Sequence, residues 1–382
     1  MIGAGCEVAD DAGGCLVIDL AAIRANYAFV AGLVAPSPVA GVVKADAYGL
    51  GAVRVARVLA EEGCGDFFVA HLSEALHLKP SLPQDARLYV LNGLQPGAEA
   101  RCAAAGVLPV LNSMEQAMAW RDLALAERRR LPALLQIDSG MSRLGLPPED
   151  VARLAETPGF FDQVEIKLVM SHLACADAPE AAANGEQLAR FERLAAMLPP
   201  LPRSFANSGG AFAAPKFHGG LVRPGLALYG ANPVEDAPNP LARVVRLDAR
   251  VIQIRTIPAG TGVGYGLTFT APDVTRLATV SVGYADGWPR QLGGRGAAYF
   301  GDVRLPIVGR VSMDSMILDV TALTDGALKP GDAVELIGPH QSLEDVARDA
   351  GTITYEILTS LGRRYARTYL DEAQTTALEI NA

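Results

Sequence analysis

A lysine in an unusual position offers the first chemistry in this chain. Lys44 ends a run of apolar and β-branched residues, Pro38 to Val43, that is typical of a buried strand. Gly49 and Gly51 interrupt the pattern, and a helical pattern follows them. Burial lowers the pKa of a lysine and frees its amine to attack a carbonyl carbon. Lys44 is therefore a candidate nucleophile, although a lysine that reaches solvent at the rim of a barrel would fit this position equally well.

Two later segments could bind a phosphate group. Ala206–Gly210 places a hydroxyl and two glycines after a predicted strand, and Val222–Leu226 introduces the next one. Small residues let backbone amides approach an anion, and parallel barrels bind phosphate by preference at the loops after their last two strands. Each segment alone is more often an ordinary turn, but together at these positions they favour a phosphorylated ligand.

A reactive lysine and a phosphate site together suggest pyridoxal 5'-phosphate, which Lys44 would hold as a Schiff base. Arg223 bears on how that cofactor would react. Because an arginine keeps its proton in a protein, Arg223 facing the pyridine nitrogen would leave this nitrogen unprotonated. The cofactor would then be a weaker electron sink, with fewer side reactions such as transamination. A salt bridge at the rim of a barrel explains Arg223 equally well.

Composition limits the class of protein. The chain has 382 residues, half of them hydrophobic, and a net charge of -9, so it can form two domains and is a poor partner for nucleic acid or anionic membranes. It has no apolar run that could span a bilayer, and residues 1–14 do not resemble a secretory signal. The five cysteines show no CxxC spacing and the histidines are scattered. We therefore expect a cytoplasmic protein with reduced thiols and no metal site.

The elements that would position these residues alternate between strands and helices. A helix is expected at Asp19–Val30, capped by Asp19, and others at Leu72–Leu78, Met114–Arg130 and Gly185–Met197. The predicted strands are Val39–Lys44, Asp66–Ala70, Leu88–Leu91, Leu108–Leu111, Ala133–Ile137, Glu165–Ser171, Arg203–Ala206 and Gly225–Leu228. This pattern predicts an α/β fold, a (β/α)8 barrel over residues 14–238.

The pattern changes after Pro233–Pro240, a proline-rich segment that is the best candidate for a linker. The runs of β type that follow are Ala249–Ile257, Thr275–Tyr284, Ala298–Phe300, Val303–Val311, Met316–Val320 and Ala333–Ile337, with one helical run at Leu343–Ala350. They predict a mainly β domain over residues 239–382. The sequence leaves open whether Leu16–Ile18 pairs with the sheet of this domain.

Eight motifs in a fixed order carry a family resemblance. They are Val43–Gly49, Asp138–Gly145, Ser171–Leu173, Ala206–Ser208, Val222–Gly225, Val263–Gly266, Gly283–Gly287 and Ser312–Asp314. With these motifs the chain resembles the alanine racemases over nearly its whole length. The resemblance implies a barrel followed by a β domain, pyridoxal phosphate as cofactor, alanine as substrate, and a homodimer with shared active sites.

The resemblance also implies a role for each matching residue. Lys44 and Tyr265 would be the two acid/base groups, and Tyr265 would come from the second subunit. Arg223 would face the pyridine nitrogen, and His172 would couple it to Tyr265 through hydrogen bonds. Arg143 would bind the phenolic oxygen of the cofactor and help bind the substrate carboxylate. The other cofactor-binding residues would be Asn207 and, at the phosphate, Tyr48, Ser208, Tyr355 and the backbone of Gly225 and Leu226.

The chemistry of racemisation explains why two acid/base groups, Lys44 and Tyr265, are needed. A proton leaves one face of the α-carbon and returns to the other, which two groups on opposite faces achieve without movement of a single base. A tyrosine has a pKa near ~10, so Tyr265 needs a charged neighbour, here Arg223 through His172, to act as a base. The expected substrate-binding residues are Arg143, Met313, Asp314 and Tyr284, with Tyr284 and Tyr355 narrowing the entrance.

Taken alone, these residues have simpler explanations. Tyr265 would be an aromatic residue of a strand or turn, and Tyr284 and Met313 would be packing residues. His172 would be an interior histidine with satisfied hydrogen bonds. The remaining carboxylates, Asp138 and Asp314, would cap helices.

One position departs from the family pattern. Many relatives have a lysine two residues before Asp138, modified to a carbamate whose negative charge orients the arginine. This chain has Gln136 there, and a neutral amide can orient Arg143 by a hydrogen bond only. We therefore expect Gln136 to hold Arg143, and the activity to be independent of bicarbonate.

Other functions stay open. A racemase of wider scope would accept serine, lysine or arginine, although Tyr284 and Tyr355 at the entrance would leave room for a small side chain only. A basic amino acid decarboxylase of the same architecture would favour a carboxylate where this chain offers Arg223. A cofactor carrier without turnover would be a single barrel and would lack the β domain with its tyrosine. The sequence does not decide between a supply of D-alanine for peptidoglycan and its catabolism.

Overall fold

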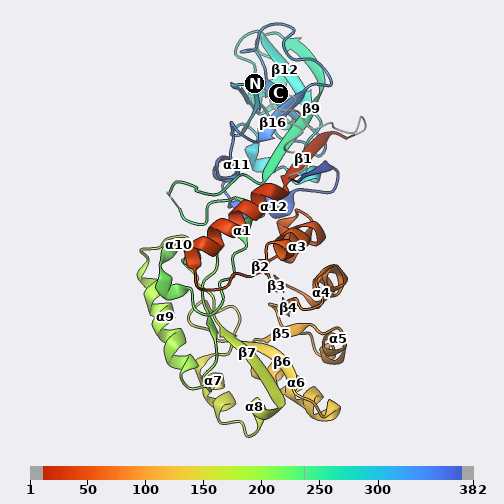
Figure 1. Ribbon diagram of the computed structural model, residues 1–382. Coiled ribbons are helices and arrows are strands. Elements are labelled where there is room, and N and C mark those ends of the chain that lie inside the picture. Colours follow the sequence, from red (N-terminus) through yellow and green to blue (C-terminus); the bar gives the residue numbers. More distant parts are fainter. Residues whose placement is uncertain (1–11, 236, 372–382) are drawn as a thin grey trace. The chain divides into compact units, whose positions relative to one another are not determined.

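The computed structural model describes residues 12–235 and 237–371 (Figure 1). The chain forms two compact units. Of the described residues, one unit comprises those from 23 to 242, and the other comprises 12–22 and 243–371. In the part described, no helix is long and apolar enough to cross a membrane.

The first unit is built on a parallel sheet whose seven strands follow chain order. They are β2 (Gly41–Val42), β3 (Asp66–Val69), β4 (Arg87–Val90), β5 (Leu108–Leu111), β6 (Leu131–Gln136), β7 (Val164–Met170) and β8 (Arg203–Ser204). The sheet closes because Val222 pairs with Val39 in parallel, with the Val222 amide donating to the Pro38 carbonyl at 2.9 Å. The predicted barrel is therefore present, with the eighth position reduced to this bridge.

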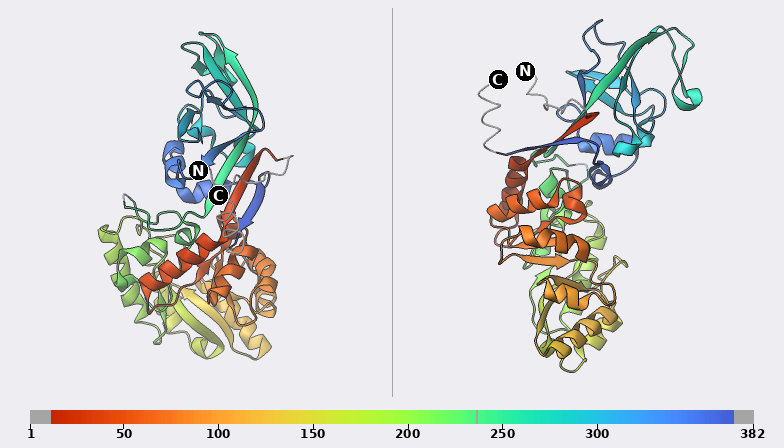
Figure 2. Two further views of the ribbon diagram at one scale, coloured as in Figure 1. Left: turned by 45° about the horizontal axis from the view of Figure 1, so that its top comes forward. Right: turned by 90° about the vertical axis from the view of Figure 1, so that its right-hand side faces the viewer.

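Helices lie outside the strands (Figures 1 and 2). They are α3 (Ala52–Glu61), α4 (Leu72–Leu78), α5 (Glu99–Ala104), α6 (Met114–Glu127), α7 (Pro148–Ala155), α8 (Phe160–Gln163), α9 (Ala182–Ala195) and α10 (Ser208–Ala213), preceded by α1 (Leu20–Val34). Asp19 caps α1 as predicted, since its Oδ1 accepts the Ala22 amide at 2.9 Å. Apolar strand residues such as Phe67, Phe68 and Leu134 are fully buried and form the core.

The predicted strand Gly225–Leu228 is wrong. Residues Leu226–Tyr229 form the 3-10 helix η3 instead. The strand ends early because Pro224 has no amide hydrogen to donate and Gly225, at φ -121° and ψ -75°, leaves the extended region. The first predicted strand is also shorter than expected, because β2 ends at Val42 and Lys44 begins the short helix α2 (Lys44–Tyr48).

The second unit is mainly β. Its largest sheet has the order β14-β13-β16-β9-β1-β17, with β12 also paired to β9 and β15 paired to β12. The strands are β1 (Gly14–Asp19), β9 (Val245–Ile257), β12 (Thr275–Val280), β13 (Ala297–Phe300), β14 (Val303–Pro306), β15 (Met316–Asp319), β16 (Ala333–Ile337) and β17 (Ala366–Leu370). β1 lies between β9 and β17, so Leu16–Ile18 does pair with this sheet.

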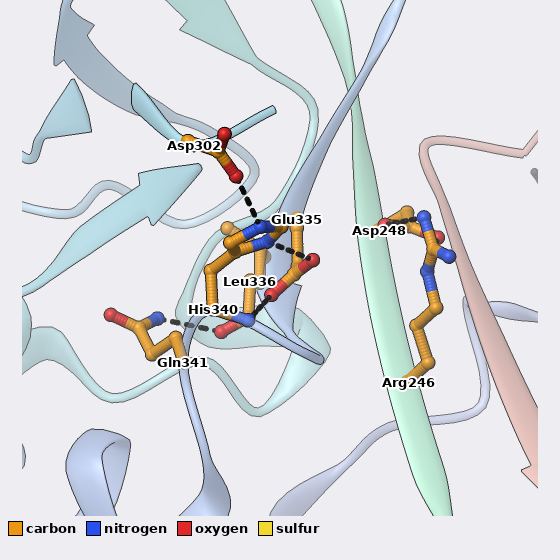
Figure 3. Close-up of polar contacts among 7 residues, drawn as sticks. All are labelled: Arg246, Asp248, Asp302, Glu335, Leu336, His340 and Gln341. Carbon is orange, nitrogen blue, oxygen red and sulfur yellow. Dashed lines mark hydrogen bonds and ion pairs between the residues drawn. The ribbon is translucent and has the colours of Figure 1, made fainter. Parts of the chain in front are cut away.

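Shorter elements complete the second unit. A small hairpin joins β10 (Gly262–Val263) to β11 (Phe269–Thr270), and the helices are α11 (Leu343–Ala350) and α12 (Thr354–Ser360). Figure 3 shows His340 between Glu335 and Asp302, with ring-nitrogen to oxygen distances of 3.1 Å to each carboxylate. Both contacts need a donated hydrogen, so the carboxylates raise the pKa of His340, Glu335 most of all.

The cysteines differ in part from expectation. Cys64 and Cys102 are buried free thiols and Cys175 is a partly buried one. Cys15 is disulfide-bonded, so the expectation of a reduced thiol is wrong there. Cys6 lies outside the described residues.

Candidate active site

Lys44 stands directly before a left-handed turn. Ala45, Asp46, Ala47 and Tyr48 all have positive φ, between 52° and 56°. Each L-residue in a left-handed helix costs about 1–2 kcal/mol, so the surrounding structure must hold this turn.

Several hydrogen bonds hold the turn, and three of them involve a carboxylate or the backbone of Asp46. Glu74 Oε1 accepts the amide of Ala45 at 2.6 Å, and Asp46 Oδ1 accepts the amide of Ala52 at 2.7 Å. The carbonyl of Asp46 accepts the amide of Gly51 at 2.9 Å. The sequence signals only the end of the turn, through Gly49 and Gly51. The contact with Glu74 was not predicted.

The surroundings of Lys44 favour a neutral amine. Burial lowers the pKa of Lys44 below its usual value, the positive charge of Arg143 lowers it further, and Glu74 acts in the opposite direction. A larger fraction of Lys44 is therefore unprotonated and able to react than for a lysine in water.

Arg223 is a buried cation without a buried anion beside it. Its side chain is 4% exposed and donates to Ser204 Oγ and, at 2.6 Å, to the carbonyl of Ser171. Among the described residues it contacts no carboxylate. Burial lowers its pKa to about 9, so it remains charged at neutral pH. Uncompensated buried charges are rare, and this one lies in the last turn of the barrel, where a ligand was predicted.

His172 follows β7 and is neutral. Burial lowers its pKa to about 3, and the charges of Arg223, Arg143 and Lys44 act in the same direction. Its Nε2 accepts a hydrogen bond from Asn207 Nδ2 at 3.5 Å. Four predicted residues from separate strand ends (Lys44, Arg143, His172 and Arg223) are thus near enough for their charges to interact.

The predicted phosphate site is compact. Ser208 Oγ accepts the amides of Gly225 and Ala227 at 3.0 and 3.2 Å. A Cβ atom at Gly225 would lie 2.4 Å from Tyr48 Oη, so only glycine fits there. Tyr48 in turn packs on Tyr229, with ring centroids 4.7 Å apart.

The residues present fit pyridoxal phosphate. Two hydroxyls suited to a phosphate, those of Tyr48 and Ser208, lie at the backbone of Gly225, and Leu226 follows directly in η3. Lys44 supplies an amine with a lowered pKa, and Arg223 supplies a buried cation that lacks an anionic partner. A ligand with an aldehyde for the amine and a hydrogen-bond acceptor for the guanidinium meets both requirements.

Asp138 shapes the loop that carries Arg143. Its Oδ1 accepts the amides of Gly140, Met141 and Ser142 at 2.8, 3.0 and 3.1 Å. Asp138 therefore organises a loop and does not cap a helix.

The expectation that Gln136 holds Arg143 is wrong. Gln136 is buried, and its Nε2 donates to the carbonyl of Leu144 at 3.2 Å. The Arg143 side chain makes no hydrogen bond or ion pair with any described residue. Gln136 thus fixes the backbone beside Arg143 and leaves the guanidinium to a ligand.

The other predicted residues belong to the β unit and are largely exposed. Tyr265 is 70% exposed, in the 3-10 helix η4 (Tyr265–Leu267). Tyr284 and Met313 lie on adjacent turns, because the Tyr284 amide donates to the carbonyl of Ser312 at 3.0 Å. Tyr355 lies in the first turn of α12. This unit therefore brings Tyr284 and Met313 together and presents Tyr265 to solvent.

Arg364, which was not predicted, joins the two turns of the β unit. Its guanidinium binds both oxygens of the buried Asp286, at 2.6 and 2.8 Å, and Asp314 Oδ1 at 2.7 Å. Asp314 is thereby held beside the turn that carries Tyr284.

Two family models match the chain. The alanine racemase N-terminal domain matches residues 18–233, and the alanine racemase C-terminal domain matches residues 244–369. The chain belongs to the alanine racemase family. A barrel followed by a β domain, as predicted, is the architecture of this family.

Several alanine racemases match this chain over nearly the whole length of both proteins. The catabolic alanine racemase of Agrobacterium fabrum is 54% identical, over 97% of this chain and 96% of its own. The alanine racemase of Brucella suis biovar 1 is 56% identical over 94% of each chain. The crystal structure of alanine racemase from Bartonella henselae with covalently bound pyridoxal phosphate superposes with a TM-score of 0.91 at 48% identity, over 94% of this chain and 100% of that one.

Substitution of Gly225 tests the phosphate site. We expect Gly225→Ala to weaken pyridoxal phosphate binding about tenfold or more, because the new methyl group displaces Tyr48 and overpacking costs about 1–3 kcal/mol. Fluorescence titration of the protein with the cofactor measures the Kd. Gly185→Ala in α9 is the control, because nothing lies within 4 Å of its Cβ position. Equal affinities for both variants would contradict this site.

The neutral state of His172 predicts a pH dependence of stability. Below pH ~6.5 the unfolded chain protonates His172, whereas the folded chain does so only near pH 3. The folded state therefore loses stability as the pH falls through this range, by at most about 1.4 kcal/mol per pH unit from this residue. Urea unfolding at pH 7, 6 and 5 should show a shallower loss for His172→Gln. Parallel losses in variant and parent would show that His172 titrates normally in the folded protein.

The hydrogen bond from the neutral Gln136 side chain to the Leu144 carbonyl leads to two predictions. Removal of its amide in Gln136→Ala should lower the free energy of unfolding by about 1–3 kcal/mol, as measured by urea unfolding, because the Leu144 carbonyl loses its donor.

Racemisation rates of the parent should be the same with and without added bicarbonate, since no lysine is available for carbamylation at this position. Activation by bicarbonate would refute this account.

Proposed function

We propose that this protein is a pyridoxal-phosphate-dependent alanine racemase that interconverts L- and D-alanine. The observation that carries the proposal is the buried, carboxylate-free Arg223 in the same cluster as Lys44 and His172. A decarboxylase would favour a carboxylate at that position. Membership of the family and the names of relatives at 54% and 56% identity support the same activity.

When bound, pyridoxal phosphate would withdraw electrons from the α-carbon of alanine and so acidify its hydrogen. Lys44 would hold the group through its amine, and Arg223 would face the ring nitrogen. Arg143 would bind its phenolic oxygen. The phosphate would be bound by Tyr48, Ser208, Tyr355 and the backbone of Gly225 and Leu226, with Asn207 nearby.

The proton transfers fall to two side chains. The lowered pKa of Lys44 leaves its Nζ able to take a proton on one face of the substrate. The Tyr265 hydroxyl would serve the other face. A neutral His172 can link Tyr265 to Arg223 by hydrogen bonds without adding a charge.

A homodimer would complete each site. Several large apolar side chains of the β unit are exposed, among them Tyr265 at 70%, Leu267 at 64% and Met313 at 53%. Exposed groups of this kind mark interaction surfaces, and a symmetric dimer would bury the same surface twice. Tyr265, Met313 and Asp314 would then reach the cofactor of the second subunit, where Met313 and Asp314 would help Arg143 bind the substrate carboxylate.

A small substrate fits the proposed entrance. Tyr284 and Tyr355, both partly exposed in the β unit, would narrow it and favour alanine over serine, lysine or arginine. We propose a cytoplasmic enzyme that either supplies D-alanine for peptidoglycan or catabolises it. Relatives from Agrobacterium fabrum and Rhizobium johnstonii carry the name catabolic alanine racemase.

A racemisation assay across a panel of amino acids tests this function. The parent should act on alanine in both directions, and Lys44→Ala should lose activity because both the attachment of the cofactor and one proton carrier are lost. Tyr265→Phe should cost about 10²–10⁴-fold, and more in the direction that starts from L-alanine. Solvent deuterium exchange into each enantiomer assigns the two faces. Turnover of another amino acid without alanine racemisation would reject the proposal.

A further inference from the structure

Glu74 connects the segment of Lys44 to the next βα unit. Glu74 is the third residue of α4, and its carboxylate accepts three backbone amides. Oε2 accepts the amides of Ala70 and His71 at 2.7 and 2.9 Å, and Oε1 accepts the amide of Ala45 at 2.6 Å.

Helix capping explains only part of this arrangement. A glutamate at the third position of a helix commonly accepts the amide of the capping residue, here His71. The bond to Ala45 is different, because it reaches back to the residue that follows Lys44. Short hydrogen bonds to an ionised carboxylate are about twice as strong as neutral ones.

The amide of Ala45 begins the left-handed turn. None of the residues 45–48 is a glycine, so each is strained in this conformation. A strong acceptor at the first amide of the turn offsets part of this cost and restricts the backbone beside Lys44.

The charge of Glu74 also acts on Lys44. Of the ionisable groups that approach the lysine, Arg143 comes from the loop after β6, His172 follows β7, and Glu74 comes from α4. Arg143 disfavours the ammonium form and neutral His172 carries no charge. Glu74 raises the pKa of Lys44 and so opposes burial.

We propose that Glu74 is a positioning residue of the active site, whose carboxylate holds the strained turn that begins directly after Lys44. Two-base racemisation requires a lysine that both releases and recovers a proton, so its two forms must lie close in free energy. Burial and Arg143 favour the neutral form, and Glu74 opposes them in part. The inference rests on the proposed function only in treating Lys44 as a reacting group.

The test compares Glu74→Gln and Glu74→Ala with a matched control. Asp345 occupies the same third position in α11 and accepts the amide of Ser342 at 3.1 Å, so Asp345→Asn removes a helix-capping carboxylate in the β unit. Competitive labelling of the full-length chain with acetic anhydride, after removal of the cofactor with hydroxylamine, measures the pKa of Lys44 from the mass spectrum of its peptide. Hydrogen–deuterium exchange of the purified enzyme measures protection of residues 45–51.

Both Glu74 variants should lower the pKa of Lys44 by about 0.5–1 unit. They should also speed exchange of residues 45–51 about tenfold, whereas Asp345→Asn should change neither quantity. An unchanged pKa of Lys44 in Glu74→Gln, or unchanged exchange in Glu74→Ala, would overturn the inference. Neither measurement requires turnover, so its failure is distinct from a failure of the parent to racemise alanine.

Discussion

The accumulation of positive charge at one end of the barrel is the constraint on which the site depends. Arg223 is buried with only a hydroxyl and a carbonyl as partners, and Arg143 has no partner among the described residues. Burial lowers the pKa of both Lys44 and His172, the charge of Arg143 lowers both further, and the charge of Arg223 also lowers that of His172. Arg223 is poorly solvated because it is buried, whereas Arg143 is exposed, and an anionic ligand would stabilise both charges. Affinity for an anion and reactivity of the lysine thus have one physical origin.

The backbone near the cluster is strained or crowded where it must approach a ligand. The left-handed turn at residues 45–48 follows Lys44, and Gly225 leaves no space for a side chain beside Tyr48. Carboxylates hold the backbone after Lys44 and the loop of Arg143 by accepting several amides each. Glu74 and Asp138 both do so, each with three bonds. Negative charge in the barrel unit is therefore used to fix backbone near the site, and the cationic side chains remain available.

Local pattern predicted most elements of the fold. Leu108–Leu111, Ala333–Ile337 and Leu343–Ala350 match the structure to the residue, because apolar periodicity and turn residues specify them. β17 was missed because Ala366–Leu370 has a mixed composition and is only partly buried, so its pairing with β1 comes from tertiary context. Candidate site residues such as Lys44 and Arg223 could be predicted from their residue types and positions. The contacts of Glu74 and Arg364 could not, because they join segments far apart in sequence. No local pattern encodes such contacts.

Gln136 shows how one neutral residue changes the balance of the site. A carbamylated lysine at this position would give the arginine a negative neighbour of its own. Here the amide of Gln136 donates to the Leu144 carbonyl, so it fixes the loop and leaves the charge of Arg143 uncompensated. That charge acts on Lys44 and His172 instead, and Glu74 is the negative group that opposes it at Lys44. Without a negative charge at position 136, the positive charge of Arg143 is offset in part by Glu74 and in part by the anionic groups of the ligand.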